Sequence, residues 1–470
     1  MIIVMSARRL LAMAVVLVAA RAWAAEPPPA WRYDVRADAG ARNLSVDAHF
    51  EAANSAEPPD SDELSVDDGA EPFVDAVAVE TAAGWRSIAR HDDAWRIPEC
   101  ARGCHVRYRF RLADAATTLE SEVAQHYGAV VQAPPSTWLL HPPRPRAGRR
   151  YHFGVQMPAG LAFVSGVALD GDGYAADVAT LADAPYSAFG PLHRQTLDVG
   201  GFRLDLAFVP FARRVDDAAI AAIVARAAAA VRRYYGRLPL PRQLMLILPG
   251  EGDALHGHTL GNGGATVELI VGDTIDKDEL AHSWVPAHEL IHVAFPSLGR
   301  SQLWLEEGLA TYVEPIARAQ LGDVDAATIW RDLVQGLPQG LPGPGDRGLD
   351  RTHSWGRTYW GGALFCFVAD VEIRERTHGQ KGLGDALRAI VAQGGSTAVA
   401  WPLARALAIG DAAVGVPVLT ELHARLGAQP GNVDLPSLWR RLGVQRVGGD
   451  VRFDEQAPLA AVRHAIVERP

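Results

Sequence analysis

Short runs of alternating hydrophobic and polar residues fill the first part of the chain, from about residue 30 to residue 210. The runs at 106–112 and 202–208 are typical, and Gly, Pro and Asp residues separate such runs from one another. Because successive side chains of a strand point to opposite faces of a sheet, this pattern predicts strands with one buried face. We therefore expect a β-rich N-terminal domain over residues 25–210.

The hydrophobic spacing changes to three or four residues after position 213. It predicts a helix that begins at Asp216 and Asp217 and ends before Gly236, because apolar residues at this spacing share one helix face. The runs at 243–248 and 265–271 then predict two strands.

Helices are expected from residue 283 onward, with a Gly/Pro-rich loop at 336–348 between them. We therefore expect an α+β multidomain protein. Its second domain covers residues 211–395, and a small helical C-terminal region covers residues 396–470.

The amino terminus differs from the rest of the chain. Arg8 and Arg9 precede an uncharged apolar run at 10–20, and Ala22 and Ala24 provide the small-x-small pattern that signal peptidase requires. This predicts a signal peptide over residues 1–24 and a secreted protein, exported to a bacterial periplasm. The apolar run is short for a membrane span, although an uncleaved anchor is the alternative.

Composition and charge exclude several classes of protein. Hydrophobic residues make up 49% of the chain and charged residues 21%, which is typical of a folded, soluble protein and excludes a disordered or polytopic membrane protein. The formal net charge is -10, and it falls to -13 without residues 1–24, which carry three arginines. We therefore expect no nucleic-acid partner, and no stable membrane insertion after signal cleavage. The sequence leaves the oligomeric state open.

The chain has three cysteines. Cys100 and Cys104, with His105 beside them, are either half of a metal site or a small disulfide. An oxidising compartment favours the disulfide. Cys366 lies in an apolar run, which is typical of a buried, inert thiol.

The strongest chemical signal is the run His288-Glu289-Leu290-Ile291-His292. On a helix, residues four apart share a face, so both imidazoles can bind one metal ion, and neutral imidazole is a natural zinc ligand. The carboxylate of Glu289 lies beside that face, where it can accept a proton from a water molecule.

A catalytic zinc site usually has a third protein ligand. Fourteen residues separate His292 from Glu307, which is enough for a turn and an antiparallel helix. Adjacent residues on a helix point about 100° apart, so only one of Glu306 and Glu307 can be the ligand. The spacing does not decide between them.

The run at 305–312, Leu-Glu-Glu-Gly-Leu-Ala-Thr-Tyr, resembles the second helix of the gluzincin metallopeptidases, in particular the aminopeptidase N and glycyl aminopeptidase groups. The resemblance implies a thermolysin-like zincin catalytic domain with Zn2+ as the cofactor. It assigns the third ligand to Glu307 and the role of general base to Glu289.

The same resemblance extends to Tyr359. The run at 359–365, Tyr-Trp-Gly-Gly-Ala-Leu-Phe, is similar to the segment that opens a helix with an oxyanion-binding tyrosine in these families. A neutral phenol can donate a hydrogen bond where negative charge develops. The resemblance therefore implies that Tyr359 is catalytic. A plain helix-start aromatic is the alternative.

The resemblance fails where such aminopeptidases carry a glutamate that binds the substrate's free amine. The corresponding stretch, 261–268, keeps Gly263 and Gly264 but has Ala265 and Thr266 at the decisive positions. These glycines are expected to line the substrate-binding strand, and the amine anchor is either lost or moved to Glu268. His256 and His258, in the preceding Gly-rich run, either contact substrate or face solvent.

These features together predict an exported zinc peptidase whose partner is a peptide or protein substrate. Aminopeptidase-like hydrolysis is the main expectation. The first alternative is an endopeptidase or short-peptide processor without the amine anchor, and the second is a zinc-stabilised binding protein without catalytic activity.

Overall fold

The computed structural model describes residues 30–51, 61–145 and 147–468. The predicted signal peptide lies outside the described residues. Within the described ranges, no helix combines the length and the apolar character needed to cross a membrane.

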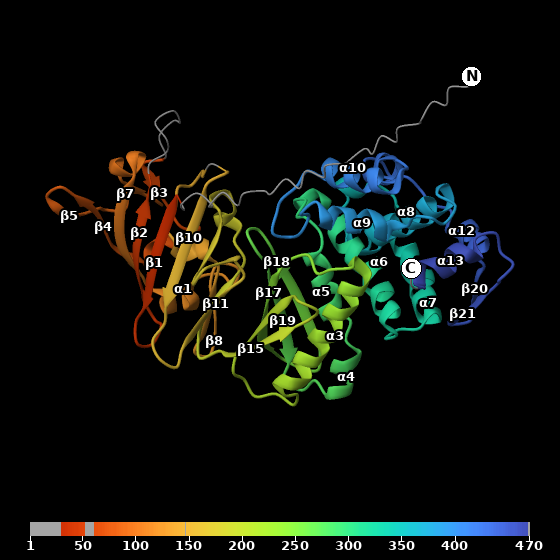
Figure 1. Ribbon diagram of the computed structural model, residues 1–470, viewed down its shortest axis with the longest axis horizontal. Coiled ribbons are helices and arrows are strands. Elements are labelled where there is room, and N and C mark those ends of the chain that lie inside the picture. The colour runs from red at the N-terminus through yellow and green to blue at the C-terminus, as the bar shows by residue number, and fades with distance from the viewer. Residues whose placement is uncertain (1–29, 52–60, 146, 469–470) are drawn as a thin grey trace, which may run out of the picture.

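Two antiparallel-rich sheets form the N-terminal domain (Figure 1). The larger has the strand order β12 (Leu169–Asp170), β13 (Gly173–Asp177), β10 (Arg150–Gln156), β1 (Trp31–Ala37), β2 (Leu44–Phe50), β7 (Cys104–Phe110), β4 (Val74–Thr81) and β5 (Gly84–Ser87). The smaller has the order β11 (Ala162–Ser165), β14 (Ser187–Gly190), β9 (Val130–Ala133) and β8 (Gln125–Tyr127). Burial alternates along β1 and β2, as the sequence pattern predicts.

The alternation gathers aromatic side chains into one core. The ring of Trp138, from the short helix α2 (Pro135–Trp138), meets Phe153, Phe163 and Phe189 edge-on at 5.4–6.1 Å. Burying side chains of this size stabilises the fold by about 1.5–3 kcal/mol each. The other elements of this domain are α1 (Leu112–Thr118) and the two-stranded ladder of β3 (Glu63–Leu64) and β6 (Trp95–Arg96).

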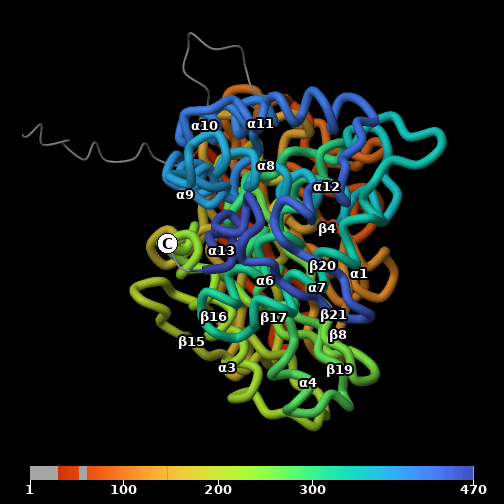
Figure 2. The backbone as a smooth tube through the Cα atoms, turned by 90° about the vertical axis from the view of Figure 1, so that its right-hand side faces the viewer, coloured from red at the N-terminus to blue at the C-terminus, as the bar shows by residue number. Residues whose placement is uncertain are grey.

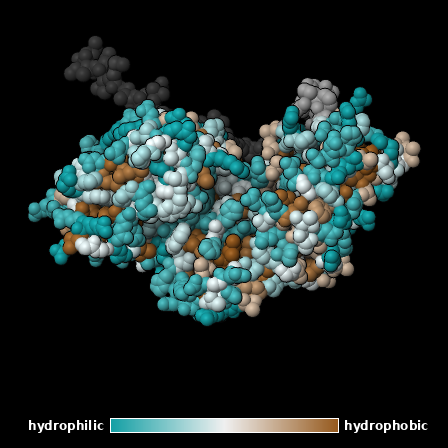
Figure 3. Space-filling model, turned by 180° about the vertical axis from the view of Figure 1, so that it is seen from behind, coloured by the Kyte–Doolittle hydropathy of each residue, from teal (hydrophilic) through white to brown (hydrophobic). Residues whose placement is uncertain are grey.

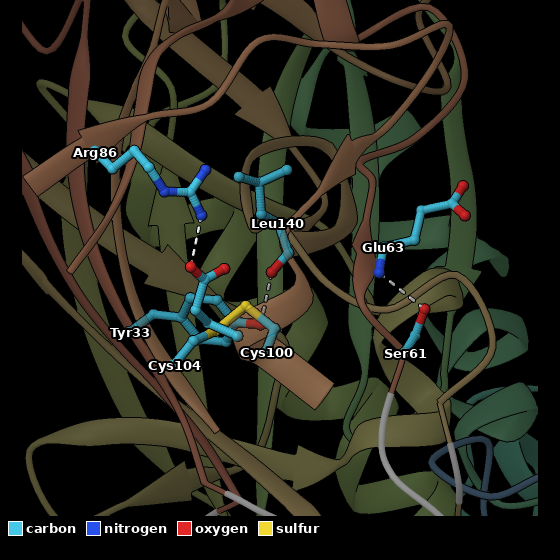
Figure 4. Close-up of a disulfide and its surroundings, with 8 residues drawn as sticks. Tyr33, Ser61, Glu63, Arg86, Cys100, Cys104 and Leu140 are labelled. Atoms are coloured by element: carbon cyan, nitrogen blue, oxygen red, sulfur yellow. Dashed lines mark hydrogen bonds and ion pairs between the residues drawn. A yellow bond between two sulfur atoms is a disulfide. The ribbon is translucent and has the colours of Figure 1, made fainter. Parts of the chain in front are cut away.

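A disulfide joins Cys100 and Cys104 at the beginning of β7, with their Cα atoms 4.6 Å apart (Figure 4). It closes the turn that leads into this strand. Beside it, the hydroxyl of Tyr33 donates a hydrogen bond to the carbonyl oxygen of Leu140 at 2.9 Å. The third cysteine, Cys366, is buried, and burial raises the pKa of its thiol.

The second domain is built on a five-stranded sheet with the order β15 (His193–Asp198), β16 (Arg203–Phe208), β17 (Arg242–Gly250), β19 (Thr266–Gly272) and β18 (Leu255–Leu260). Strand β18 is antiparallel to β19 and forms one edge. This corrects the predicted domain boundary at residue 210, because β16 pairs with β17 and β15 pairs with β16. Alternation identifies a strand but does not identify its partner sheet.

Helices cover this sheet and form the rest of the domain (Figure 1): α3 (Asp217–Tyr235), α4 (Lys277–His282), α5 (Val285–Val293), α6 (Leu303–Leu321), α7 (Ala326–Gly336), α8 (Gly362–Arg376) and α9 (Leu383–Ala392). Helix α3 has the predicted limits. The side chain of Asp216 accepts a hydrogen bond from the amide of Ala219, and Gly236 ends the helix in the left-handed conformation, with φ 76°.

The C-terminal region contains α10 (Leu403–Val414), α11 (Val418–Leu422), α12 (Leu435–Leu442), α13 (Ala460–Val467) and the hairpin β20 (Val444–Val447) and β21 (Asp450–Phe453). It is therefore not wholly helical. It also shares its hydrophobic core with the second domain, since Trp439 packs against Trp330 and Phe367. Figure 2 shows α12 and the hairpin running beside α7.

Hydrophilic residues cover most of the rear face of the molecule, and hydrophobic residues form small, separate patches on it (Figure 3). The described chain thus has a β-sheet domain followed by a mainly helical domain, which agrees with the predicted α+β class.

Candidate metal centre and catalytic cavity

Helices α5 and α6 bring the three predicted metal ligands together. The Nε2 atoms of His288 and His292 each lie 3.5 Å from Oε2 of Glu307, and the three donor atoms lie within 4.8 Å of one another. His288 is 5% exposed. Two imidazoles and one carboxylate that converge in this way match the donor set of a catalytic zinc site, so the residues fit the implied metal.

Local sequence fixes the positions of both helices. Pro286 lies in the first turn of α5, where its missing amide hydrogen is no loss. Gly308 lets α6 approach α8 closely, since a Cβ atom there would lie 2.2 Å from the Cα atom of Gly362. The close approach places the segment before α8, which contains Tyr359, beside the ligand helix.

The charges of the three ligands are coupled. Burial raises the pKa of Glu307, but hydrogen bonds from His288 and His292 outweigh it and hold this pKa well below its usual range. Burial lowers the pKa of His292, yet the hydrogen bond and charge of Glu307 raise it to about 9. For His288, burial dominates and lowers the pKa. The carboxylate is therefore ionised and suited to a cation.

The spacing did not decide which of the two adjacent glutamates faces the histidines, and the structure places them differently. Oε1 of Glu306 accepts a hydrogen bond from the amide of Leu298 at 2.8 Å, in the turn between α5 and α6. Burial raises the pKa of Glu306. Glu307 faces the histidines instead, as the family resemblance implies.

Glu289 is 7% exposed and lines the same cavity, which has a volume of about 320 Å³. The hydroxyl of Thr259, on the edge strand β18, donates a hydrogen bond to Oε2 of Glu289 at 2.7 Å. A Cβ atom at Gly257 would lie 2.3 Å from Cγ of Glu289. The edge strand therefore packs directly against the predicted base and fixes one of its two oxygens.

Tyr359 also lines the cavity and lies in a π-helical turn, Arg357–Gly361, that leads into α8. Such turns are often found at functional sites. Burial raises the pKa of Tyr359 to about 12, with further contributions from Glu307 and Glu289. The phenol is therefore neutral and able to donate its proton to a hydrogen bond at neutral pH.

The predicted substrate glycines lie elsewhere. Gly263 and Gly264 pack against the N-terminal domain: the carbonyl of Gly263 accepts a hydrogen bond from the amide of Ala168 at 3.0 Å, and Gly264 forms a β-bridge with Val167. They do not line the cavity. The cavity is lined on this side by β18 instead, whereas the turn after β18 lies against the N-terminal domain.

Glu268 is buried below this wall at 5% exposure. The side-chain amide of Gln132, from β9 of the N-terminal domain, donates a hydrogen bond to it. Oε2 of Glu268 lies 3.8 Å from Nδ1 of His258, whose pKa is raised mainly by this carboxylate. The glutamate is therefore close to the cavity but already has two partners.

Sequence reasoning missed several residues of the cavity wall. His256 and His258, for which the sequence left substrate contact or solvent exposure open, line the cavity from β18, whose run Leu-His-Gly-His-Thr-Leu alternates in the manner of a strand. Nothing in the sequence indicated Thr259. Thr397 lines the cavity from beyond the predicted boundary at 395, and its carbonyl accepts a hydrogen bond from the amide of Asn262 at 2.8 Å.

No protein-family model and no curated protein matches this sequence. Solved structures do match it. An aminopeptidase N family protein from Idiomarina loihiensis has a TM-score of 0.65 at 15% identity, covering 88% of this chain and 78% of that one. The chain has the M1 metallopeptidase fold.

Two further M1-like structures agree. A substituted M1 zinc metallopeptidase from Deinococcus radiodurans, bound to a Tyr-Ser-Ala substrate, has a TM-score of 0.51 at 16% identity and covers 85% of this chain and 93% of that one. Aminopeptidase A of Legionella pneumophila, in complex with aspartic acid, has a TM-score of 0.54 at 11% identity, with coverages of 85% and 49%. The His288, His292 and Glu307 group is consistent with the HExxH…E zinc site of this fold.

Proposed function

We propose that the protein is an exported zinc-dependent peptidase. The observation that carries the proposal is the convergence of His288, His292 and Glu307 in the cavity that also contains Glu289 and Tyr359. A metal-ligand set, a carboxylate base and a neutral phenol are groups that suit metal-assisted hydrolysis of a peptide bond.

Zinc held by the two histidines and Glu307 would supply Lewis acidity, lowering the pKa of a water molecule and polarising the scissile carbonyl group. Glu289 accepts the water proton at Oε1, since Thr259 holds its Oε2 atom at 2.7 Å. It then delivers the proton to the leaving amine.

Tyr359 contributes a second stabilising interaction. Its neutral hydroxyl faces the same cavity and donates a hydrogen bond to the oxyanion that forms when the carbonyl carbon becomes tetrahedral. Burial of the ring raises the pKa to about 12, so this proton stays on the phenol throughout the neutral pH range.

The substrate of this site is a peptide with apolar or aromatic side chains near the scissile bond. Trp284 and Leu303 line the cavity and are 51% and 46% exposed. Trp355, which is 62% exposed, lies beside Tyr359 with ring centroids 5.7 Å apart. Exposed apolar groups that cluster at a cavity favour apolar ligands.

Aminopeptidase-like hydrolysis is supported by the fold, because the solved M1 structures include an enzyme bound to a tripeptide substrate. One observation favours the second candidate, an endopeptidase or short-peptide processor. Glu268, the carboxylate that the sequence offered as a displaced amine anchor, is enclosed by Gln132 and His258 and so is not open to a free amine.

The test is a comparison of paired fluorogenic peptides with free and acetylated amino termini, assayed with the zinc-loaded protein. Aminopeptidase activity requires cleavage of the free peptide alone. Comparable kcat/KM for both members of each pair identifies the second candidate. Stoichiometric zinc without cleavage of either peptide contradicts the proposed function itself.

Export to a bacterial periplasm is the cellular part of the proposal. It is supported by the signal-like pattern of residues 1–24 and by the disulfide between Cys100 and Cys104, which an oxidising compartment maintains. Fractionation of cells that express the full chain tests it, together with the mass of the mature protein.

A further inference from the structure

A second group of metal-binding side chains lies on the outer face of the larger N-terminal sheet. Asp47 and His49 are two residues apart on β2 and so share a face, and His105 on β7 is the direct cross-strand partner of His49. All three project from rigid strands. Figure 1 shows β2 and β7 in the left-hand part of the molecule, whereas α5 and α6 belong to the second domain, to their right.

The donor atoms of this group converge on one point. Oδ1 of Asp47 lies 2.5 Å from Nε2 of His105 and 3.1 Å from Nε2 of His49. The two imidazole rings stack with centroids 3.8 Å apart and an interplanar angle of 20°. Stacking turns both Nε2 atoms toward the same carboxylate oxygen, and the three donors lie within 4.8 Å of one another.

Glu80, on the neighbouring strand β4, orients one of these ligands. Its Oε2 atom lies 2.7 Å from Nδ1 of His105. When a metal ion takes the place of the proton on Nε2, a carboxylate at Nδ1 holds the remaining ring proton, which is the arrangement that metal-binding histidines commonly have. The ring of Trp85 covers the other side of His105 edge-on, at a centroid distance of 4.9 Å.

The surroundings leave room for the remaining positions of a coordination sphere. The side chain of His105 is 22% exposed, and those of His49 and Asp47 are 47% and 46% exposed, so solvent reaches the point where the donors meet. Arg107, the cross-strand partner of Asp47, places its guanidinium carbon 4.1 Å from the centroid of the Trp85 ring.

We propose that Asp47, His49 and His105 bind a divalent transition-metal ion, with Glu80 as the residue that orients His105. Two imidazoles and a carboxylate select zinc-like ions over magnesium or calcium, which prefer oxygen ligands. The site belongs to the N-terminal domain and does not depend on the proposed peptidase function.

Zinc stoichiometry tests this proposal. After equilibration of the full chain with buffered Zn2+ and gel filtration, elemental analysis should find two zinc ions per chain in the wild type. It should find one in the His288→Ala/His292→Ala variant, which retains only the N-terminal site. Adding Asp47→Asn to that variant should abolish binding, because the amide keeps the shape of the carboxylate but loses its charge.

The controls separate loss of the site from loss of the fold. His91→Ala removes an exposed histidine outside the group and should leave the stoichiometry unchanged. Zn2+ should raise the melting temperature of the His288→Ala/His292→Ala variant but not that of its Asp47→Asn derivative. A wild type with one zinc and a His288→Ala/His292→Ala variant with none would overturn the proposal and identify the group as an ion-pair network. If only the proposed catalytic site failed to bind zinc, the wild type and the His288→Ala/His292→Ala variant would each contain one zinc ion.

Discussion

Glu289 has two carboxylate oxygens with different surroundings. Oε2 accepts the hydrogen bond of Thr259, and the lack of a side chain at Gly257 lets Glu289 pack closely against β18, with Oε1 beside Gly257. A base whose orientation is held by these contacts favours proton transfer in a fixed geometry. The sequence indicated the base from its place between two histidines, but the residues that hold it come from a distant strand.

Tyr359→Phe tests the oxyanion role. Because the phenol is assigned to the developing negative charge and not to ground-state binding, we expect kcat to fall by about 10²–10³ while KM changes little. Steady-state kinetics on the preferred peptide measures both. A fall in kcat/KM that comes wholly from KM would assign Tyr359 to substrate binding instead.

The buried carboxyl group of Glu314 should make the free energy of unfolding depend on pH. It is 8% exposed and pairs with Arg318 at 2.9 Å, not with a zinc-binding histidine, and burial raises its pKa to about 7 from the usual 4.5. The folded protein therefore holds this proton more tightly than the unfolded chain. The resulting stability is fully present below pH 4.5 and is lost as the pH rises through 7.

We expect Glu314→Gln to remove this loss. Between pH 5 and pH 8, the free energy of unfolding of the wild type should decline relative to that of the variant by up to about 3 kcal/mol. Urea denaturation at a series of pH values measures it. Parallel pH profiles of the two proteins would contradict the assignment.

Helices and strands were predictable from the sequence where a regular spacing of apolar residues coincides with residues that mark the ends of the element. Helix α3 has both, since its apolar face is continuous and Asp216 and Gly236 mark its ends. Less could be learned from the sequence about which strands pair with one another. Strands β15 and β16 have the same alternation as the N-terminal strands, yet their hydrogen bonds lead to β17, because sheet membership depends on contacts between distant segments.

Gly308→Ala tests the packing of the ligand helix. The added methyl group would meet the backbone of Gly362 at 2.1–2.2 Å, so α6 and α8 must separate. We expect a loss of about 1–3 kcal/mol in the free energy of unfolding, together with weaker zinc binding as Glu307 moves. Gly343→Ala, in a loop with no atom within 4 Å of its added Cβ, should change neither. Equal stability of the two variants would contradict this view of the helix contact.

At the scale of the whole molecule, the cavity depends on three parts of the chain. The N-terminal domain contacts the turn after β18, and the segment after α9 pairs with the same turn, since the carbonyl of Ala398 accepts a hydrogen bond from the amide of Gly263 at 2.8 Å. The sequence predicted a division at residue 395, where a small helical region was expected to begin. It carried no sign that residues on both sides form one core.

Truncation after residue 395 tests this interdependence. The shortened chain loses Trp439, which packs against Trp330 and Phe367, and the pairing with the cavity turn. We expect it to lack a cooperative thermal transition and to lose activity, as measured by calorimetry and peptide hydrolysis. A truncated protein with wild-type melting and activity would show that the C-terminal region is a separate unit.

The central claim is that Glu289 drives hydrolysis at a zinc site formed by His288, His292 and Glu307. The most direct measurement compares the wild type with Glu289→Gln on one peptide library, with zinc content determined for both. We expect full zinc loading in each, cleavage by the wild type, and a fall in kcat of about 10²–10⁴ in the variant, the usual contribution of a general base. Zinc-loaded wild type that cleaves no peptide, or a variant with wild-type turnover, would contradict the account.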